Sequence, residues 1–402
     1  MKIFVLSPIY ATTTQGAGAT PVVHYFTREW VKIGHEVVVF NLVAKFPKII
    51  YWIGRHFQHR LNTKLGMLVP IETPTEEDYL ADGVVVHRRC MKKLVPHARY
   101  SKRQIQRALS FISDVCDKNG KPDWFVGHWD NPQLELLDAL KQRFGVPTCI
   151  VFHSNEFDFE QKYGEDGLRM LANIDVIGFR SNIGQNNYIA KYGDPKHSFV
   201  ACSGVSEAFL KAGSTMDITI QQPIHNFVYV GSLIGRKFPS TIVTALSRAY
   251  PKGDFTIIFI GDGAEKGNVE EEQRKQGGLG KVIFTGRIAR EEIIEYLKKA
   301  DVFVMISKDE IFGLVYLEAM ALGLIPIGSK NEGIDGVIKD GENGFLCEAG
   351  NVDELTEVLE KIKQMPMEQL RQIAQKAKAT ALDYSDEGVA KQYIDALVSC
   401  NG

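Results

Sequence analysis

The sequence predicts an α/β protein made of two doubly wound domains, each built on a mostly parallel sheet. The chain has 402 residues, and a single hydrophobic core stops growing at roughly 250–300 residues. Short apolar runs alternate with helical stretches in both halves of the chain, which is typical of parallel sheets flanked by helices. Residues 211–225 interrupt this alternation and are interpreted as a linker.

The first forty residues predict a strand, a loop, a helix and a second strand. Residues 2–7 are apolar, residues 8–20 are rich in Thr and Gly, and residues 22–33 have helical spacing that Gly34 ends. Residues 36–40 are apolar again, so this βαβ unit should form a parallel pair with a right-handed connection. Later apolar runs in this half predict strands at 124–126, 148–152, 176–179 and 199–201.

The alternation of predicted strands and helices starts again after the linker. Residues 227–230 predict a strand, Gly231 lies in the loop that follows, and residues 239–249 predict a helix. Further strands are expected at 255–260, 282–284, 302–306 and 324–327, with helices at 290–299 and 315–322.

We therefore expect an N-terminal domain over residues 1–210 and a C-terminal domain over residues 225–385. The segment 386–402, with a helix over 386–398, is expected to pack back on the first domain. Because such sheets bind ligands at the carboxyl ends of their strands, two facing domains would place a cleft there.

Composition excludes several classes of protein. The net charge of -2 argues against a generally cationic nucleic-acid binder. The apolar run at residues 3–6 is too short for a signal peptide, and no run approaches the ~18 apolar residues of a membrane span. The six cysteines form no C-x-x-C pair and are interpreted as reduced thiols. We expect a cytoplasmic protein.

The most informative segment is residues 306–345, which reads as strand, loop, helix, strand and a second Gly-rich loop. Glu310 lies in the loop before the helix, and Glu318 lies inside it. The amides of residues 311–314 open that helix and would suit an anionic ligand. Carboxylates placed there can accept hydrogen bonds from sugar hydroxyls, including both hydroxyls of a ribose.

This segment resembles a known family. Phe-Gly-Leu after the first glutamate, Glu-Ala-Met-Ala at the second and Asp-Gly-Glu-Asn-Gly-Phe-Leu at 340–346 are similar to the retaining nucleotide-sugar glycosyltransferases of family 4. That family has the GT-B fold, two facing Rossmann-like domains with a donor cleft between them. The similarity continues along the chain at 1–8, 16–18, 34–37, 153–156, 203–205, 261–263 and 284–286.

The resemblance implies a role for each matching residue. Glu310 would contact the transferred sugar, and Glu318 would bind the ribose hydroxyls of the donor. Lys237 would neutralise the leaving diphosphate, where charge grows in the transition state. His153 would touch the sugar from the first domain, and His128 has the same place after a strand with weaker support. The other implied donor-binding residues are Gly16, Gly18, Gly231, Arg236, Ile311, Phe312, Gly313 and Leu314.

Two positions depart from the family pattern. Ser232 stands where the family usually has an arginine, so either Arg236 supplies the missing charge or the diphosphate clamp is weaker. The later glycine pair is also altered, to Asn331-Glu332-Gly333. Each motif residue has a plainer alternative: Glu318 as a solvated helix carboxylate, Lys237 as a surface lysine and His153 as an interior histidine.

The sequence predicts no metal site, because no D-x-D triplet follows a strand and no Asp/His cluster has ligand spacing. No cofactor is expected, and the nucleotide sugar is a substrate. The resemblance implies same-face substitution, in which the leaving phosphate helps to deprotonate the acceptor hydroxyl.

Residues 1–110 carry 16 Lys+Arg against 7 Asp+Glu, so the near-neutral total conceals a basic N-terminal region. Basic residues interleaved with aromatics suit an anionic membrane surface. The alternatives are a site for an anionic acceptor or a solvated helix face beside a core-packing stripe. The residues concerned are Lys48, Arg55, Arg60, Arg88, Arg89, Lys92 and Lys93.

We therefore expect a retaining transferase that moves a sugar from a UDP- or GDP-sugar to a glycan or lipid-linked hydroxyl, in bacterial surface-polysaccharide or related glycan synthesis. It would be cytoplasmic, with a peripheral place on the inner face of the membrane, and would bind no nucleic acid. The alternatives are a sugar-nucleotide epimerase of the same architecture and a non-catalytic nucleotide-sugar-binding protein, the latter suggested by Ser232.

Overall fold

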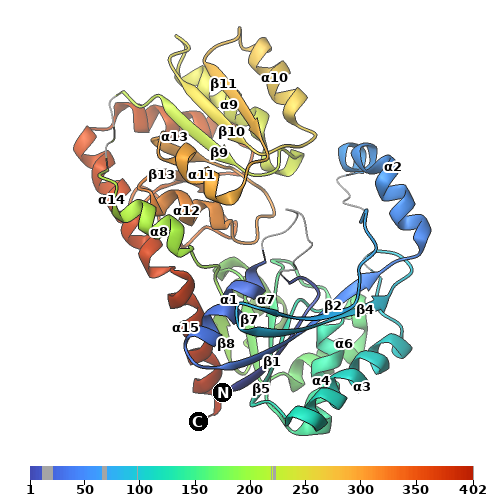
Figure 1. The fold of residues 1–402 in the computed structure, drawn as a ribbon. Helices are drawn as coiled ribbons and strands as arrows, with labels where there is room; N and C mark the ends of the chain where they lie inside the picture. Colours follow the sequence, from blue (N-terminus) through green and yellow to red (C-terminus); the bar gives the residue numbers. More distant parts are fainter. Residues whose placement is uncertain (11–20, 66–69, 97, 219, 221–222, 402) are drawn as a thin grey trace. The chain divides into compact units, whose positions relative to one another are not determined.

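The computed structural model describes the chain except residues 11–20, 66–69, 97, 219, 221–222 and 402, with residues 58–65 and 401 described by their backbone alone (Figure 1). The chain divides into two compact units. The first comprises Met1–Ser203 and Asp386–Gly402, and the second comprises Gly204–Ser385.

The first unit is built on an eight-stranded sheet in the order β3-β4-β2-β1-β5-β6-β7-β8. All neighbouring strands are parallel except β3, which pairs antiparallel with β4 at one edge. The order reverses between β1 and β5, which is the topological switch point where such sheets bind ligands. The strands are β1 (Lys2–Ser7), β2 (Glu36–Lys45), β3 (Glu77–Ala81), β4 (Val84–Lys92), β5 (Trp124–His128), β6 (Thr148–Phe152), β7 (Val176–Phe179) and β8 (Ser198–Val200).

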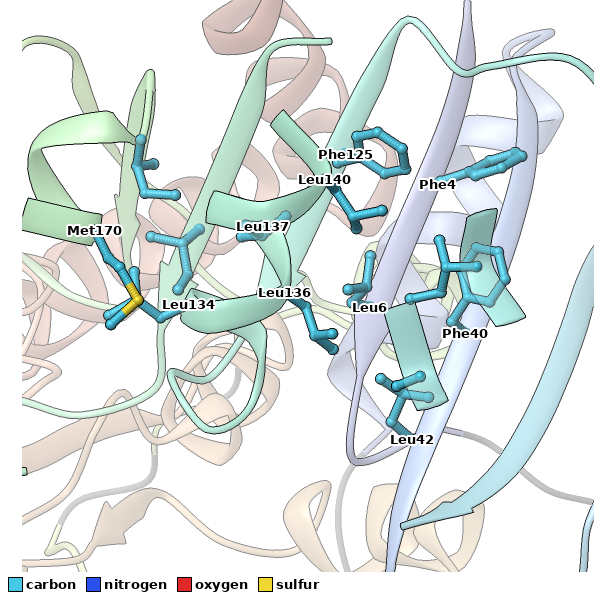
Figure 2. Close-up of a cluster of buried hydrophobic side chains, with 14 of the residues drawn as sticks. Phe4, Leu6, Phe40, Leu42, Phe125, Leu134, Leu136, Leu137, Leu140 and Met170 are labelled. Atoms are coloured by element: carbon cyan, nitrogen blue, oxygen red, sulfur yellow. The ribbon is translucent and has the colours of Figure 1, made fainter. Parts of the chain in front are cut away.

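Helices cover this sheet, and its central strands are buried on both faces. Ile3 to Leu6 in β1 are fully buried, which explains the continuous apolar run that predicted this strand. Phe4 lies edge-on to Phe40 with ring centroids 5.4 Å apart, in a core cluster that includes Leu136 and Leu140 (Figure 2). The helices are α1 (Val22–Lys32), α2 (Lys48–Leu65), α3 (Lys102–Asn119), α4 (Gln133–Phe144), α5 (Phe159–Tyr163), α6 (Glu165–Asn173), α7 (Asn182–Tyr192) and α15 (Asp386–Val398), with the short η2 (Ser399–Asn401).

The last helix completes the first unit. The indole Nε1 of Trp30 in α1 donates a hydrogen bond of 3.1 Å to the carbonyl of Ala390 in α15. The ring of Tyr393 lies 4.9 Å from that of Trp30, and Arg28 forms an ion pair of 3.0 Å with Asp386. Figure 1 shows α15 beside α1 although the two are more than 350 residues apart in the chain.

The second unit has a six-stranded parallel sheet in the order β11-β10-β9-β12-β13-β14. This is the Rossmann order 3-2-1-4-5-6, with its switch point between β9 and β12. The strands are β9 (Asn226–Val230), β10 (Thr256–Ile260), β11 (Lys281–Gly286), β12 (Val302–Val304), β13 (Ile325–Ser329) and β14 (Phe345–Cys347). The helices are α8 (Glu207–Ser214), η1 (Gly235–Lys237), α9 (Pro239–Ala249), α10 (Lys266–Lys275), α11 (Arg290–Leu297), α12 (Leu314–Ala321), α13 (Val352–Gln364) and α14 (Met367–Asp383).

The region interpreted as a linker differs from the expectation at its start. Residues 211–214 are the last turn of α8, which belongs to the second unit. A Cβ at Gly213 would lie 2.0 Å from the carbonyl oxygen of Ala321, so glycine lets α8 approach the end of α12. The unit boundary therefore falls after Ser203, before the expected end at residue 210.

In the part of the chain that the structure describes, no helix is both long and apolar enough to cross a membrane.

Candidate functional site

The candidate site of the second unit lies at its switch point, where β9 and β12 end side by side. Gly231 directly follows β9 and has a φ of +154°. A Cβ at this position would lie 3.1 Å from the Nζ atom of Lys237, so glycine leaves room for that ammonium group. Lys237 is carried by the short helix η1 between β9 and α9. The loop after β9 thus places the ammonium group of Lys237 at the carboxyl edge of the sheet.

The loop after β12 places the carboxylate of Glu310 at the same edge of the sheet. An Oε2 atom of Glu310 lies 3.2 Å from Nζ of Lys237 and 3.6 Å from a guanidinium nitrogen of Arg236. The side chains of Lys237 and Glu310 are only 12% and 16% exposed. Because charges in such a partly buried place are poorly screened by water, the pair interacts more strongly than a surface ion pair. The structure therefore brings together the three predicted residues.

Arg236 is held against the loop that carries Glu310. Its guanidinium donates hydrogen bonds to the carbonyls of Lys308, at 3.0 Å, and Asp309, at 3.3 Å. Ser232, which replaces the usual arginine, is exposed, and its carbonyl accepts a bond of 2.8 Å from the Tyr229 hydroxyl. Arg236 is thus a second cation beside Glu310.

Glu332 is part of this site, although sequence reasoning noted it only as an alteration of the glycine pair. Its two carboxylate oxygens accept hydrogen bonds from the backbone amides of Asp309, at 3.0 Å, and Glu310, at 2.7 Å. Burial raises the pKa of Glu332, and the neighbouring Asp309 and Glu310 carboxylates raise it further. Gly333 must remain small because a Cβ there would lie 2.0 Å from the Ile311 carbonyl oxygen.

The N-terminus of α12 completes the site. Gly313 adopts a φ of +80° immediately before the helix, and a Cβ there would meet the ring of Tyr316 at 2.6 Å. Phe312 is buried, Leu314 begins the helix, and the intervening backbone presents the amide end of α12. This arrangement offers N–H donors and a partial positive charge to an anion.

Glu318 lies one turn into α12 and is buried, so the alternative of a solvated helix carboxylate is wrong. Its Oε1 accepts a hydrogen bond of 2.8 Å from Nε of Arg290 and a second from the same guanidinium. Arg290 also lies 5.7 Å from the ring centroid of Phe209. Arg290 was missed by sequence reasoning, because it is 28 residues from Glu318 and belongs to no recognised motif.

In the first unit, two histidines meet at the ends of β5 and β6. Nδ1 of His128 lies 3.0 Å from Nε2 of His153, and the His153 ring stacks on Trp129 at 3.7 Å. Burial, with the nearby positive charge of Arg180, lowers the pKa of His128 to about 3 and that of His153 well below its usual value. Both imidazoles are therefore neutral at pH 7, able to hydrogen bond without carrying charge. The contact of His153 with a sugar stays a prediction.

The predicted glycines Gly16 and Gly18 lie outside the described residues. Arg60 lies in α2, where only its backbone is described.

One of the basic residues predicted to lie on an acceptor or membrane surface is not on the surface. Arg88 is only 6% exposed and forms an ion pair of 3.2 Å with Glu77 in the neighbouring strand β3, so it faces no membrane. Arg89 is bonded to Asp78 and lies 4.3 Å from the Phe111 ring centroid. Lys93 is partly buried over a tyrosine ring, and the exposed members are Lys48, Arg55 and Lys92.

Within the described ranges, no group of three or more His, Cys, Asp or Glu side chains is arranged to hold a metal ion. Metal independence stays a prediction.

Solved structures share this architecture. A glycosyltransferase from Rickettsia africae has a TM-score of 0.72 at 15% identity, covering 99% of this chain and 98% of that one. HepE of Anabaena, solved in complex with UDP, has a TM-score of 0.66 at 17% identity, covering 99% and 100%. Two Rossmann-like units matched over their whole length define the GT-B fold, as predicted.

Sequence comparisons match part of the chain to a known family. Residues 220–380 match the family described as "Glycosyl transferases group 1". An uncharacterized glycosyltransferase of Methanocaldococcus jannaschii is 29% identical over 70% of this chain and 75% of its own length. Residues 220–380 are therefore similar to the group 1 glycosyl transferases, in agreement with the predicted resemblance.

Other curated relatives match over shorter segments. N-acetyl-alpha-D-glucosaminyl L-malate synthase of Bacillus anthracis is 29% identical over 38% of this chain and 39% of its own length. The lipopolysaccharide core biosynthesis glycosyltransferase LpsE of Rhizobium meliloti is 29% identical over 42% and 48%. This chain thus spans about two-fifths to half the length of these relatives.

Proposed function

We propose that this protein transfers a sugar from a nucleotide-diphosphate-sugar donor to an acceptor hydroxyl with retention of the anomeric configuration. The observation that carries the proposal is the ion pair of Lys237 with Glu310, at 3.2 Å, beside the amide end of α12. The site combines cations for a diphosphate, a carboxylate for sugar hydroxyls and helix N–H donors for an anion. The named relatives are glycosyltransferases, which supports this interpretation.

In the proposed reaction, the donor diphosphate replaces Glu310 as the partner of Lys237 and Arg236. Glu310 is then released to accept hydrogen bonds from the sugar. As the glycosidic bond breaks, negative charge grows on the diphosphate, and the two cations stabilise it most strongly in the transition state. Glu318 binds the ribose hydroxyls, and the two hydrogen bonds from Arg290 hold that buried carboxylate in place.

Retention would follow from same-face substitution, in which the leaving phosphate takes the proton of the acceptor hydroxyl. A double displacement would instead need a protein nucleophile on the opposite face of the sugar, with two carboxyl groups about 5 Å apart. Of the three carboxylates at the candidate site, Glu318 is paired with Arg290, Glu332 accepts bonds from backbone amides, and Glu310 is assigned to the sugar hydroxyls, so none is proposed as the nucleophile.

The first experiment is a thermal-shift screen with uridine, guanosine and adenosine diphosphates and their sugars. A ligand that binds only the folded protein raises its melting temperature, so the largest shift identifies the donor. Proton NMR of the product formed with that donor then gives the anomeric configuration. An inverted product would overturn retention, and epimerised donor without transfer would establish the epimerase alternative.

The proposed setting is cytoplasmic synthesis of a cell-surface glycan. It is supported by the similarity to LpsE, a glycosyltransferase named for lipopolysaccharide core biosynthesis, and by the basic composition of residues 1–110. Transfer is proposed to need no metal, since Lys237 and Arg236 supply the charge that a cation otherwise provides. Undiminished product formation in the presence of EDTA is the expected result.

A further inference from the structure

A second site is indicated in the first unit, at the carboxyl ends of β2 and β4. A cavity of about 280 Å³ opens here beneath the start of α3. Leu42, Met91, Ala108 and Phe111 give it an apolar wall, and the first three are buried. Its volume is near the lower end of the range for small-molecule sites, and the carboxyl edge of a parallel sheet is where such sites form.

The rim of the cavity carries positive charge that the protein does not neutralise. Lys45, Lys92 and Arg107 line it, and none of the three forms an ion pair with a described Asp or Glu. No residue outside the described ranges is Asp or Glu either. A fourth cation, Arg89, is already bonded to Asp78, and the lining acid Glu76 is a single opposing charge.

Two of these cations are neighbours in the sheet. Lys45 and Lys92 are register partners at the last rung of the parallel β2–β4 ladder. Like charges at adjacent ladder positions repel each other, and an anion bound between them would remove that repulsion. The register thus places two lysines side by side, and neither forms an ion pair with a described carboxylate.

A buried polar group also points to a ligand. Gln104 lines the cavity and is only 8% exposed. Its Oε1 accepts a hydrogen bond of 2.9 Å from the backbone amide of Lys92, whereas no described residue accepts one from its Nε2. The Nε2 amide of this mostly buried side chain is therefore available to donate a hydrogen bond to a ligand oxygen in the cavity.

We propose that this cavity binds a phosphate ester joined to an apolar group, with the phosphate at Lys45, Lys92 and Arg107 and the apolar part against Leu42 and Phe111. That the bound phosphate ester is the sugar acceptor rests on the proposed function, whereas the binding of a phosphate ester in this cavity does not. An acceptor linked to a lipid through phosphate and a soluble phosphate ester share this chemistry.

The test measures binding of n-octyl phosphate and of inorganic phosphate to the full chain by titration calorimetry, without donor. We expect octyl phosphate to bind at least ten-fold more tightly than inorganic phosphate. The double variant Lys92→Glu, Arg107→Glu should weaken octyl phosphate binding at least ten-fold. The matched control Arg103→Glu, Lys118→Glu reverses two exposed charges on α3 outside the cavity and should change it less than two-fold.

Cys90 lines the same cavity and gives a second, independent readout. Octyl phosphate should slow alkylation of Cys90 and leave Cys400 unaffected, as measured by peptide mass spectrometry. Equal weakening by both double variants, no protection of Cys90, or equal affinity for inorganic phosphate would each overturn the proposal.

Co-sedimentation with phosphatidic-acid vesicles distinguishes the two sources. Vesicle binding lost in the Lys92→Glu, Arg107→Glu variant supports a lipid, and octyl phosphate binding without vesicle binding supports a soluble ester. The nucleotide-induced thermal shift of the same variant separates this proposal from the proposed function. If the variant loses octyl phosphate binding but keeps the nucleotide-induced thermal shift, the two sites are separate. If it loses both, the proposal of two separate sites is overturned.

Discussion

The carboxylate of Glu332 accepts a hydrogen bond of 2.7 Å from the backbone amide of Glu310, the residue assigned to the transferred sugar. The same carboxylate accepts a bond of 3.0 Å from the amide of Asp309. Asp309 has a φ of +55°, in the left-handed region that few residues other than glycine adopt. Glu332 therefore fixes the loop backbone from which Glu310 reaches Lys237.

Replacing Glu332 tests this positioning role. In Glu332→Gln only one side-chain oxygen remains, so one of the two loop amides loses its acceptor. We expect kcat to fall roughly ten-fold or more, with the donor KM changing less than kcat, because the nucleotide contacts remain. Glu342→Gln, at an exposed glutamate in a nearby loop, is the matched control. Equal kinetics for the two variants would contradict the role.

Lys237→Ala should lower kcat about 10²- to 10³-fold, as does removal of a single group that stabilises transition-state charge in other enzymes. Arg236→Ala should cost less, because Arg236 is 40% exposed and lies farther from Glu310 than Lys237 does. Steady-state kinetics with the identified donor measure both effects, and the exposed Lys252→Ala serves as the control. A larger loss in the arginine variant would reverse the assigned order.

Arg290 and Glu318 should act together on nucleotide affinity. Glu318→Gln removes the charge that pairs with Arg290 and weakens the hydrogen bonds offered to a ribose, so the nucleoside diphosphate should bind about ten-fold less tightly. Arg290→Gln should weaken binding and also reduce stability by about 1–3 kcal/mol, since it leaves the buried carboxylate without its charged donor. Calorimetry on both single variants and the double variant gives the coupling between them. Additive losses would show that the pair does not act as a unit.

The neutral histidines make the stability of the protein depend on pH. The folded-state pKa of His128, about 3, and that of His153 lie below the unfolded value of about 6.5. The unfolded chain therefore binds more protons below pH 6.5, and stability is lost as the pH falls from there toward 3. Denaturant unfolding at pH 7, 6 and 5 should show this decline, with a smaller slope in His128→Gln than in His56→Gln, at an exposed histidine. Identical slopes in the two variants would refute the contribution of His128.

The packing of α15 against α1 should contribute strongly to the free energy of unfolding. Tyr393 is 1% exposed and contacts both Trp30 and Phe199. Tyr393→Ala should lower the free energy of unfolding by about 3–5 kcal/mol, the usual cost of removing a buried aromatic ring. Val398→Ala, at a half-exposed position of the same helix, should cost less than about 1 kcal/mol. Chemical denaturation of both variants measures the difference.

The sequence predicted most strands of the first unit's sheet but missed the edge formed by β3 and β4. Fully buried strands such as β1 and β6 produce continuous apolar runs and were found within a residue or two. The β3–β4 hairpin was missed because β4 contains Arg88 and Arg89. Their charges are paired with Glu77 and Asp78 of β3, and this pairing is seen only once the two strands are aligned.

The candidate site divides in the same way. Glu310 and Glu318 belong to one local motif, Lys237 lies in an earlier one after Gly231, and all three were predicted, although only the fold shows that Lys237 meets Glu310. Arg290 begins α11 and Glu332 stands where the glycine pair of the motif is altered, so only the fold shows that they contact Glu318 and the loop of Glu310. Arg88 shows the opposite failure, since a basic stretch was interpreted as surface although its central arginine is buried.

Because α15 belongs to the first unit, this unit consists of two stretches of chain separated by the whole of the second. A ribosome adding about 5–20 residues per second needs on the order of 10–40 s to make the intervening chain. During that time the face of α1 that carries Trp30 lacks its cover. A nascent chain that stops before residue 386 keeps this apolar face open to chaperones and proteases, so the first unit is closed only once residues 386–398 have been made.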